Sequence, residues 1–168
     1  VIMRFDETGR MTSARFASAI IRSCRRFTYE EAIELMPQSD EAIDQRDDPV
    51  EVSLGHHLKR AWSLAKLLRE NRFEAGALDL DFPEVRAVLD EDGRAVGVKR
   101  SEYDESHQLI EEFMLAANEA VARETKNQQA PSLYRIHEDP DPEKLFEFAS
   151  QATGYGYHPG DVTVRAEL

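Results

Sequence analysis

The sequence predicts an α+β fold in which a small antiparallel sheet is packed by long amphipathic helices. Two segments, His56–Phe73 and Glu105–Arg123, repeat apolar residues at helical spacing. Between and before them, short alternating segments meet at turns that contain glycine, a pattern typical of β-hairpins. With 168 residues the chain is long enough to bury a core, so we expect a single domain covering residues 1–168.

The first hairpin is expected from Val1–Asp6 and Met11–Arg22, because Gly9 supplies the tight position of the turn between them. A second hairpin pairs Arg86–Leu89 with Ala95–Lys99 around an Asp-Gly turn. Two further strands would complete one antiparallel sheet, and these are Gly76–Pro83 and Leu133–Ile136.

Capping residues mark where the shorter helices begin. Thr28 is a good N-cap for a helix Tyr29–Leu35, and Glu31 stands where a capping box requires it. The stretch Met36–Gly55 is rich in acids and contains two prolines, which predicts a polar loop. Near the end of the chain, Asp141 as N-cap followed by proline predicts a helix Pro142–Gln151. Its buried side is expected at Leu145, Phe148 and Ala149.

The segment Ser106–Arg123 organises the rest of the prediction. Its expected buried stripe consists of Ile110, Phe113, Met114, Ala117 and Val121. Glu111 lies at the edge of the stripe, and Asn118 is about two helical turns further on, so both share a face. The short strand that follows carries Arg135 and ends at His137. A carboxylate, an amide, a guanidinium and an imidazole on two consecutive elements form a candidate site, although a core helix with polar edges has the same pattern.

Charge is distributed unevenly along the chain. The net charge of −12 argues against nucleic acid as a partner, since phosphate binding draws on lysine and arginine. Between Thr8 and Tyr29, however, there are five arginines and no acidic residue. From Glu30 to Glu51 the local charge is instead strongly negative. A chain with separate basic and acidic faces can still bind RNA on one of them.

Cysteine content and hydropathy indicate in which cellular compartment the protein is expected. The single cysteine, Cys24, permits no disulfide and no cysteine-based zinc site, which fits the reducing cytoplasm. No apolar run is long enough to span a membrane. Val1–Arg4 begins like the interior of a strand and Asp161–Leu168 like an interrupted helix, so we expect both ends to be truncated.

Two clusters of residues that could bind a metal do not have the spacing of a metal site. The acids Asp44, Asp47, Asp48 and Glu51 lack the glycine that an EF-hand loop needs. His56 and His57 are adjacent on a predicted helix and therefore point to different faces. We expect no metal site within this chain.

The string HQLIEEFMLAANEAVA, followed by LYRIHEDPDPEKL, resembles the catalytic RNB domain of the ribonuclease II and ribonuclease R exoribonucleases. The first hairpin and the element Arg26–Tyr29 that follows it are similar to the same family, so the resemblance covers essentially the whole chain. It implies a partial RNB-type domain, its middle portion, from an enzyme that processively hydrolyses RNA from the 3′ end to 5′-mononucleotides. In that family an acidic run binds Mg²⁺, and the Mg²⁺ ion holds the attacking water. This acidic run lies upstream of the region matched here. The isolated chain is therefore expected to bind no metal and to be inactive.

The resemblance also implies roles for particular side chains on single-stranded RNA. Tyr29 would contact a terminal base, and Glu111 would bind ribose hydroxyls. Asn118, Arg135 and His137 would orient or neutralise their neighbours, and Arg22, Arg25 and Arg26 would face phosphates. The position of an aromatic RNA clamp found in some members corresponds to Leu80, which is aliphatic.

Two other classes of function stay open at this point. One is an RNB-like protein that binds RNA but has lost catalysis. The other is an acidic protein-interaction module that docks partners through Asp40–Glu51.

Overall fold

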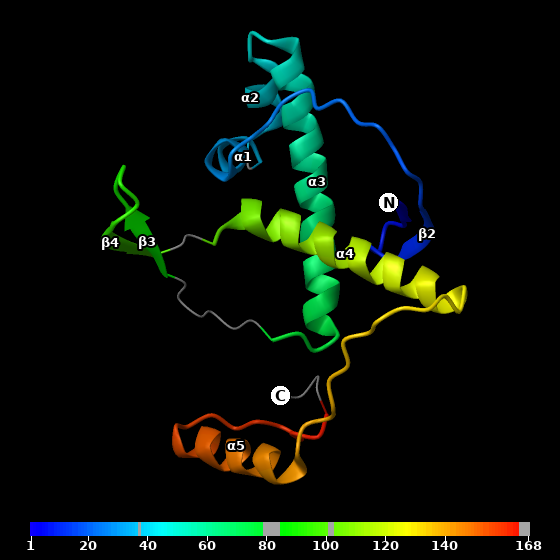
Figure 1. The fold of residues 1–168 in the computed structure, drawn as a ribbon, viewed down its shortest axis with the longest axis vertical. Coiled ribbons are helices and arrows are strands. Elements are labelled where there is room, and N and C mark those ends of the chain that lie inside the picture. The colour runs from blue at the N-terminus through cyan, green and yellow to red at the C-terminus, as the bar shows by residue number, and fades with distance from the viewer. Residues whose placement is uncertain (37, 79–84, 101–102, 165–168) are drawn as a thin grey trace. The chain divides into compact units, whose positions relative to one another are not determined.

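The computed structural model describes residues 1–36, 38–78, 85–100 and 103–164, and Figure 1 shows their order. The elements are β1 (Ile2–Phe5), β2 (Met11–Arg15), α1 (Tyr29–Leu35), α2 (Asp40–Asp44), α3 (Pro49–Glu74), β3 (Val85–Leu89), β4 (Ala95–Arg100), α4 (Glu105–Asn127) and α5 (Pro142–Gly154). Long helices accompany small antiparallel sheets, which confirms the expected α+β class.

The chain divides into two compact units. The first comprises Val1–Arg69 and Leu80–Ala120, and the second comprises Glu70–Asp79 and Val121–Leu168. Of the helices that the structure describes, none combines the length and the apolar character needed to cross a membrane.

The expected single sheet is wrong for the described residues, where the strands form two separate two-stranded sheets. In the first, β1 pairs with β2 from Ile2↔Arg15 to Phe5↔Met11, and Gly9 adopts a φ of 76° in the turn. The predicted strand Met11–Arg22 ends at Arg15, which pairs with Ile2 of β1, and residues 16–22 are irregular.

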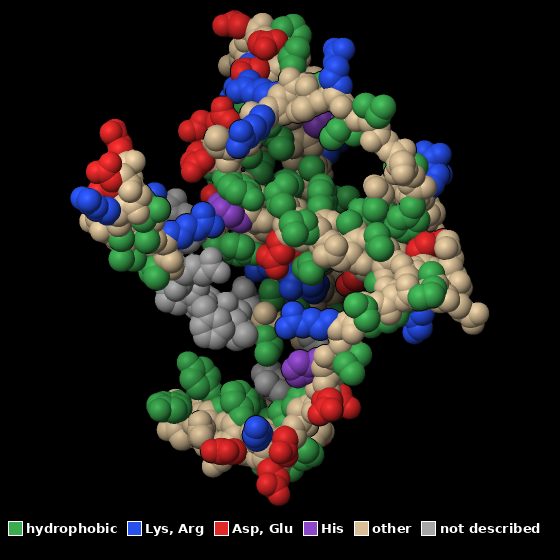
Figure 2. All heavy atoms as spheres, in the orientation of Figure 1, with side chains coloured by type: hydrophobic (Ala, Val, Ile, Leu, Met, Phe, Trp, Pro, Cys, Tyr) green, Lys and Arg blue, Asp and Glu red, His purple; other side chains and the backbone are tan. Residues whose placement is uncertain are grey.

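The second sheet confirms the other predicted hairpin. Strand β3 pairs with β4 from Val85↔Arg100 to Leu89↔Ala95, and Gly93 takes a φ of 78° at the turn. Hydrophobic side chains lie exposed on this hairpin, as Figure 2 shows. Of the predicted strand Gly76–Pro83, residues 76–78 are irregular and the remainder lies outside the described residues.

Helix α1 begins where the capping box was predicted. The Thr28 hydroxyl accepts a hydrogen bond from the Glu31 amide at 3.2 Å, and the Glu31 carboxylate accepts one from the Thr28 amide at 2.8 Å. These two bonds satisfy amides that the helix itself cannot. They fix the backbone at Tyr29, the first helical residue.

The predicted loop Met36–Gly55 is wrong in most of its length, because it contains α2 and the first turns of α3. Ser39 caps α2 by accepting from the Ala42 amide at 3.2 Å, and Pro49 occupies the first position of α3. Ile43 of α2 is fully buried. A single buried isoleucine within an acidic stretch gives little periodic signal, so the loop interpretation missed it.

The core of the first unit lies where α1, α3 and α4 meet, and Figure 1 shows α4 crossing α3. Its buried centre consists of Met36, Ala65 and Leu109. Around this centre pack Ala32 of α1, three residues of α3 (Leu58, Ala61 and Trp62) and Phe113 of α4. The junction holds the N-terminal turns of α1 and α4 against each other, which positions the site described below.

The buried face of α4 differs from the predicted stripe by about one residue. Its buried residues are Ser106, Leu109, Glu112 and Ala120, whereas Ile110, Met114 and Val121 are exposed. Glu112 is only 3% exposed, and Arg69 of α3 lies 3.8 Å from its carboxylate. A buried carboxylate is stable only when it is paired, so the ion pair with Arg69 explains why Glu112 can face the interior.

In the second unit, Asp141 caps α5 as predicted and accepts from the Glu143 amide at 2.9 Å. No residue of α5 is fully buried, but Leu145 and Ala149 of the predicted buried side are half-buried, whereas Phe148 is exposed. The predicted strand Leu133–Ile136 is wrong, because these residues are irregular and exposed. A strand needs a neighbour to satisfy its backbone, and the described residues of this unit offer none.

Candidate functional site

An aromatic stack joins the first turns of α1 and α4. The rings of Tyr29 and His107 lie 3.8 Å apart between centroids and 17° from parallel. Tyr103 extends the group, its ring 6.1 Å from that of His107 and tilted by 40°. Tyr29 is 43% exposed, so the stack is anchored on the protein and open to solvent.

Asp104 holds His107 in place. Its carboxylate oxygen Oδ1 lies 2.8 Å from Nδ1 of His107 and accepts from the Ser106 amide at 3.0 Å and the Ser106 hydroxyl at 2.5 Å. Asp104 thus caps α4 and orients the imidazole with the same atom. Partial burial raises the pKa of Asp104, but hydrogen bonds from Ser106 and His107 outweigh it, so the pKa lies below its usual value.

The lowered pKa of Asp104 predicts a pH dependence of stability. A carboxylate whose pKa is lower in the folded state stabilises the fold above its unfolded pKa, near 4, and loses that contribution as pH falls through the folded value. Asn is an equally good N-cap but carries no charge. We expect Asp104→Asn to lower the free energy of unfolding at pH 6 and to match the wild type near pH 2. Urea titrations at both pH values measure this, and a constant difference would contradict it.

Glu111 belongs to the same cluster. It lies four residues after His107 and therefore on the same face of α4. Its carboxylate is half-buried and accepts a hydrogen bond from the Tyr103 hydroxyl. The structure thus brings Glu111 and Tyr29, both predicted site residues, to one cluster through His107 and Tyr103. Asn118, two turns further along α4, is exposed.

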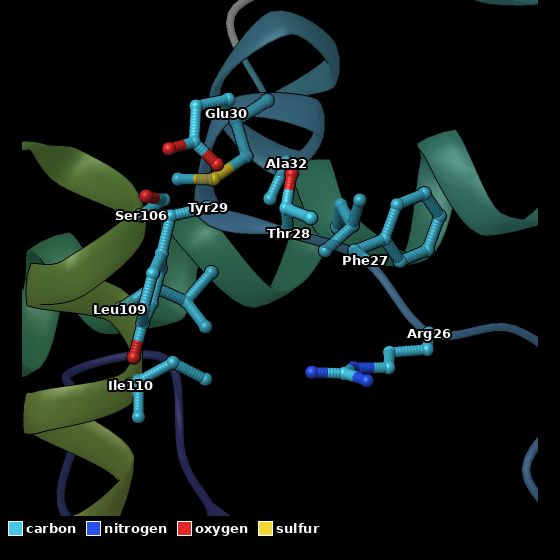
Figure 3. Close-up of a pocket in the computed structure, with 11 residues that line it drawn as sticks. Arg26, Phe27, Thr28, Tyr29, Glu30, Ala32, Ser106, Leu109 and Ile110 are labelled. Atoms are coloured by element: carbon cyan, nitrogen blue, oxygen red, sulfur yellow. The ribbon is translucent and has the colours of Figure 1, made fainter. Parts of the chain in front are cut away.

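A pocket of about 420 Å³ adjoins Tyr29 in the first unit, and Figure 3 shows it in close-up. Its walls are mostly apolar and come from α1, α3 and α4, with Phe27, Met36, Leu58, Leu109 and Ile110 among them. Tyr29 extends beside Leu109 and Ile110, and the guanidinium of Arg26 lies across the opening from Ile110 (Figure 3). The pocket therefore combines two aromatic residues, apolar walls, one cation (Arg26) and one carboxylate (Glu30).

The other predicted arginines lie in different surroundings. Arg25 forms ion pairs with Glu51 and, at 3.5 Å, with Glu31, so its guanidinium faces carboxylates. Hydrogen bonds from Arg25 and Arg46 lower the pKa of Glu51. Figure 2 shows further acidic side chains around α1 and α2. Arg22 is exposed in the irregular segment before α1.

The remaining predicted site residues lie in the second unit or outside the described residues. Arg135 and His137 are exposed in the second unit, where Nδ1 of His137 lies 2.7 Å from the carbonyl oxygen of Glu138. Leu80 lies outside the described residues.

Sequence reasoning missed His107, Asp104 and Tyr103. The pairing of Asp104 with His107 could have been predicted from the sequence. An aspartate at a helix N-cap that is followed three residues later by a histidine can accept hydrogen bonds from both the helix amides and the imidazole. The stack on Tyr29 could not have been predicted, since the two rings come from distant segments and meet only through tertiary packing.

The described part of the chain contains no group of three or more carboxylate, imidazole or thiol side chains placed to hold a metal ion. Among the described residues, none is therefore grouped in a way that fits a Mg²⁺ centre. No catalytic step is therefore assigned to them.

The fold and the site define a mixed α+β domain with an open aromatic stack beside an apolar pocket. The chain belongs to the RNB domain family, whose model matches residues 1–165. It is 35% identical over 157 residues to ribonuclease R of Aquifex aeolicus (strain VF5), covering 94% of this chain and 22% of that protein. It is 33% identical over 171 residues to ribonuclease R of Thermotoga maritima, covering 95% of this chain and 23% of that protein.

Solved structures agree on the fold. Mycoplasma genitalium RNase R in complex with ribose-methylated single-stranded RNA superimposes with a TM-score of 0.77 at 24% identity, covering 94% of this chain and 24% of that one. The same protein in complex with double-stranded RNA also gives 0.77. The resemblance found in the sequence is thus confirmed, and the chain spans 22–23% of the length of the two curated relatives.

Proposed function

We propose that this chain forms part of the RNA channel of a 3′–5′ exoribonuclease that hydrolyses RNA processively to 5′-mononucleotides. Its membership of the RNB family and its similarity to proteins named ribonuclease R support the enzyme class. The RNA-bound structures of a similar protein support RNA as the ligand. The observation that carries the assignment to this part of the chain is the exposed Tyr29 ring, stacked on His107 beside a pocket that Arg26 lines.

Each feature of the site has a chemical counterpart in a nucleotide. An exposed aromatic ring stacks on any base, and a carboxylate accepts hydrogen bonds from ribose hydroxyls. In the proposal Tyr29 takes the terminal base and Glu111 the ribose. Arg26 binds a phosphate as a bidentate donor. Arg22, Asn118, Arg135 and His137 are proposed to contact RNA further along the strand. Arg25 was expected to face a phosphate as well, and we propose instead that it stabilises the fold through its ion pairs with Glu31 and Glu51.

The proposal divides catalysis between this chain and further polypeptide. Mg²⁺ and the aspartates that hold it are assigned to residues outside 1–168, and this chain supplies binding and orientation. A catalytically inactive RNB-like protein would bind RNA by the same residues. The two are separated by whether a longer polypeptide containing this chain carries the acidic run.

Docking of a protein partner on Asp40–Glu51 has less support. Asp40 forms an ion pair with Lys59 at 2.8 Å, and Asp44 lies 2.8 Å from Nε2 of His56. Glu51 binds Arg25 and Arg46. These carboxylates hold α2 and the segment before α1 to α3, which gives them a function within the fold.

The proposed function predicts RNA binding without cleavage. We expect the 168-residue chain to bind a 5′-fluorescein-labelled single-stranded RNA in anisotropy titrations, with an affinity that falls as salt rises. Replacing Arg26 by Gln should reduce the slope of log K against log salt by about one, while Lys144→Gln on α5 should leave it unchanged. Incubation with Mg²⁺ should leave the RNA intact on a denaturing gel.

Two outcomes would contradict this account. Failure to bind RNA at about 50 mM salt, where phosphate contacts are strongest, would overturn the binding role. Release of mononucleotides by the pure chain would overturn the division of catalysis.

A further inference from the structure

Tyr29 has different surroundings on its two sides. His107 stacks on one face of the ring at 3.8 Å. Tyr29 also lines the pocket of about 420 Å³ and is 43% exposed, so part of its ring stays open although the imidazole stacks on it. In Figure 3 Leu109 and Ile110 lie beside the Tyr29 ring. A base that entered the pocket would meet a ring already supported from behind.

Both rings are fixed at their backbones. The capping box of Thr28 and Glu31 sets the first residue of α1, which is Tyr29. Asp104 caps α4, and His107 lies in its first turn. Each ring thus extends from a capped helix start, and the core at the junction of these helices holds the two starts together.

Asp104 also fixes the plane of the imidazole. Its oxygen lies 2.8 Å from Nδ1 of His107, and the same oxygen is held by the amide and hydroxyl of Ser106. An imidazole bound in this way keeps one orientation, whereas an aliphatic side chain at this position would have no such restraint. A fixed ring of this kind limits the motion of the tyrosine stacked on it.

We propose that His107, oriented by Asp104, is a positioning residue that supports Tyr29 from behind, so that imidazole, phenol ring and the 3′-terminal base of RNA form a three-layer stack. This inference rests on the proposed function, because it takes RNA as the ligand. It adds a residue for which the sequence offered no role. Since stacking uses the face of any base, the support by His107 acts on RNAs of every sequence but requires that a terminal base be present.

A double-mutant cycle between protein and RNA tests this. One RNA carries a normal 3′-terminal nucleotide, and a second carries an abasic ribose at that position. The dissociation constants of both are measured by anisotropy for the wild-type chain and for His107→Ala. We expect His107→Ala to weaken binding of the normal RNA by about 2- to 12-fold, the range of an aromatic pair, and to leave binding of the abasic RNA unchanged.

Two variants separate positioning from general stability. His107→Phe keeps an aromatic ring on Tyr29 but cannot bind Asp104, and we expect it to retain more affinity for the normal RNA than His107→Ala. His158→Ala, an exposed histidine in the second unit, should leave both RNAs unaffected. Urea midpoints of all variants show whether each one folds.

Equal losses on both RNAs would overturn the inference, because a structural defect does not depend on the terminal base. It would also be overturned if the wild type bound normal and abasic RNA equally well, a result that leaves RNA binding itself intact. A wild-type chain that bound neither RNA would overturn the proposed function and this inference with it.

Discussion

Replacing Ile43 by Ala is expected to lower the free energy of unfolding by about 2–5 kcal/mol, the cost of emptying a buried isoleucine site. Ile43 is 0% exposed and lies on the five-residue helix α2. Its side chain packs on Gly55 of α3, where a Cβ atom would come within 2.9 Å of Ile43 Cγ2. The contact is close because Gly55 has no side chain. The buried Ile43 holds α2 on α3, and α2 has few other apolar residues that could do so.

The comparison that checks this uses urea unfolding of Ile43→Ala beside Ile20→Ala. Ile20 is 103% exposed, so its loss should change the free energy of unfolding by less than about 0.5 kcal/mol. A similar effect of the two substitutions would show that α2 does not depend on its buried isoleucine.

Gly55→Ala extends the same prediction. Alone, the new methyl group would collide with Ile43, and overpacking costs about 1–3 kcal/mol against a helix-propensity gain near 1 kcal/mol. In the Ile43→Ala background the collision is gone. There we expect Gly55→Ala to stabilise the chain by about 1 kcal/mol, and an unchanged effect in both backgrounds would contradict the contact.

Capping residues and turn glycines made several boundaries predictable. Thr28 with Glu31 gave the start of α1, Asp141 with Pro142 gave that of α5, and Gly9 marked the first hairpin turn. In each case the structural cause is local, because a side chain or a permissive backbone acts within a few residues.

Elements that depend on distant partners were harder to predict. The alternating pattern after Met11 continues to Arg22, but β2 ends at Arg15, opposite Ile2 of β1. The segment at Leu133–Ile136 has the composition of a buried strand, yet it is irregular. Periodicity reports which side of a segment is apolar, and it does not report whether a neighbouring strand exists.

The site residues also fall into those that the sequence could identify and those that depend on contacts between distant segments. Tyr29 and Glu111 were identified through family resemblance, and the structure brings them to one cluster. His107 and Tyr103 connect them. His107 follows a helix-capping aspartate, but it gains its stack on Tyr29 only from the packing of α1 on α4. On α4 itself, the sequence pattern did not show that Glu112, rather than Ile110, faces inward, since its pairing with Arg69 comes from another helix.

Tyr29→Ala is expected to weaken binding of single-stranded RNA by roughly 5- to 150-fold, because base–aromatic stacking contributes about 1–3 kcal/mol per base. The loss should be confined to stacking, since the capping box that starts α1 uses Thr28 and Glu31. Tyr29→Phe keeps the ring and should bind nearly as the wild type does. Tyr155→Ala, which removes an exposed tyrosine of the second unit, is the matched control.

The most direct measurement is therefore the dissociation constant for one single-stranded RNA, determined for wild type, Tyr29→Ala, Tyr29→Phe and Tyr155→Ala in the same buffer. The account predicts a large loss for Tyr29→Ala alone, with wild-type affinity in the other two variants. Wild-type affinity in Tyr29→Ala, from a chain that remains folded, would contradict the assignment of this stack to RNA.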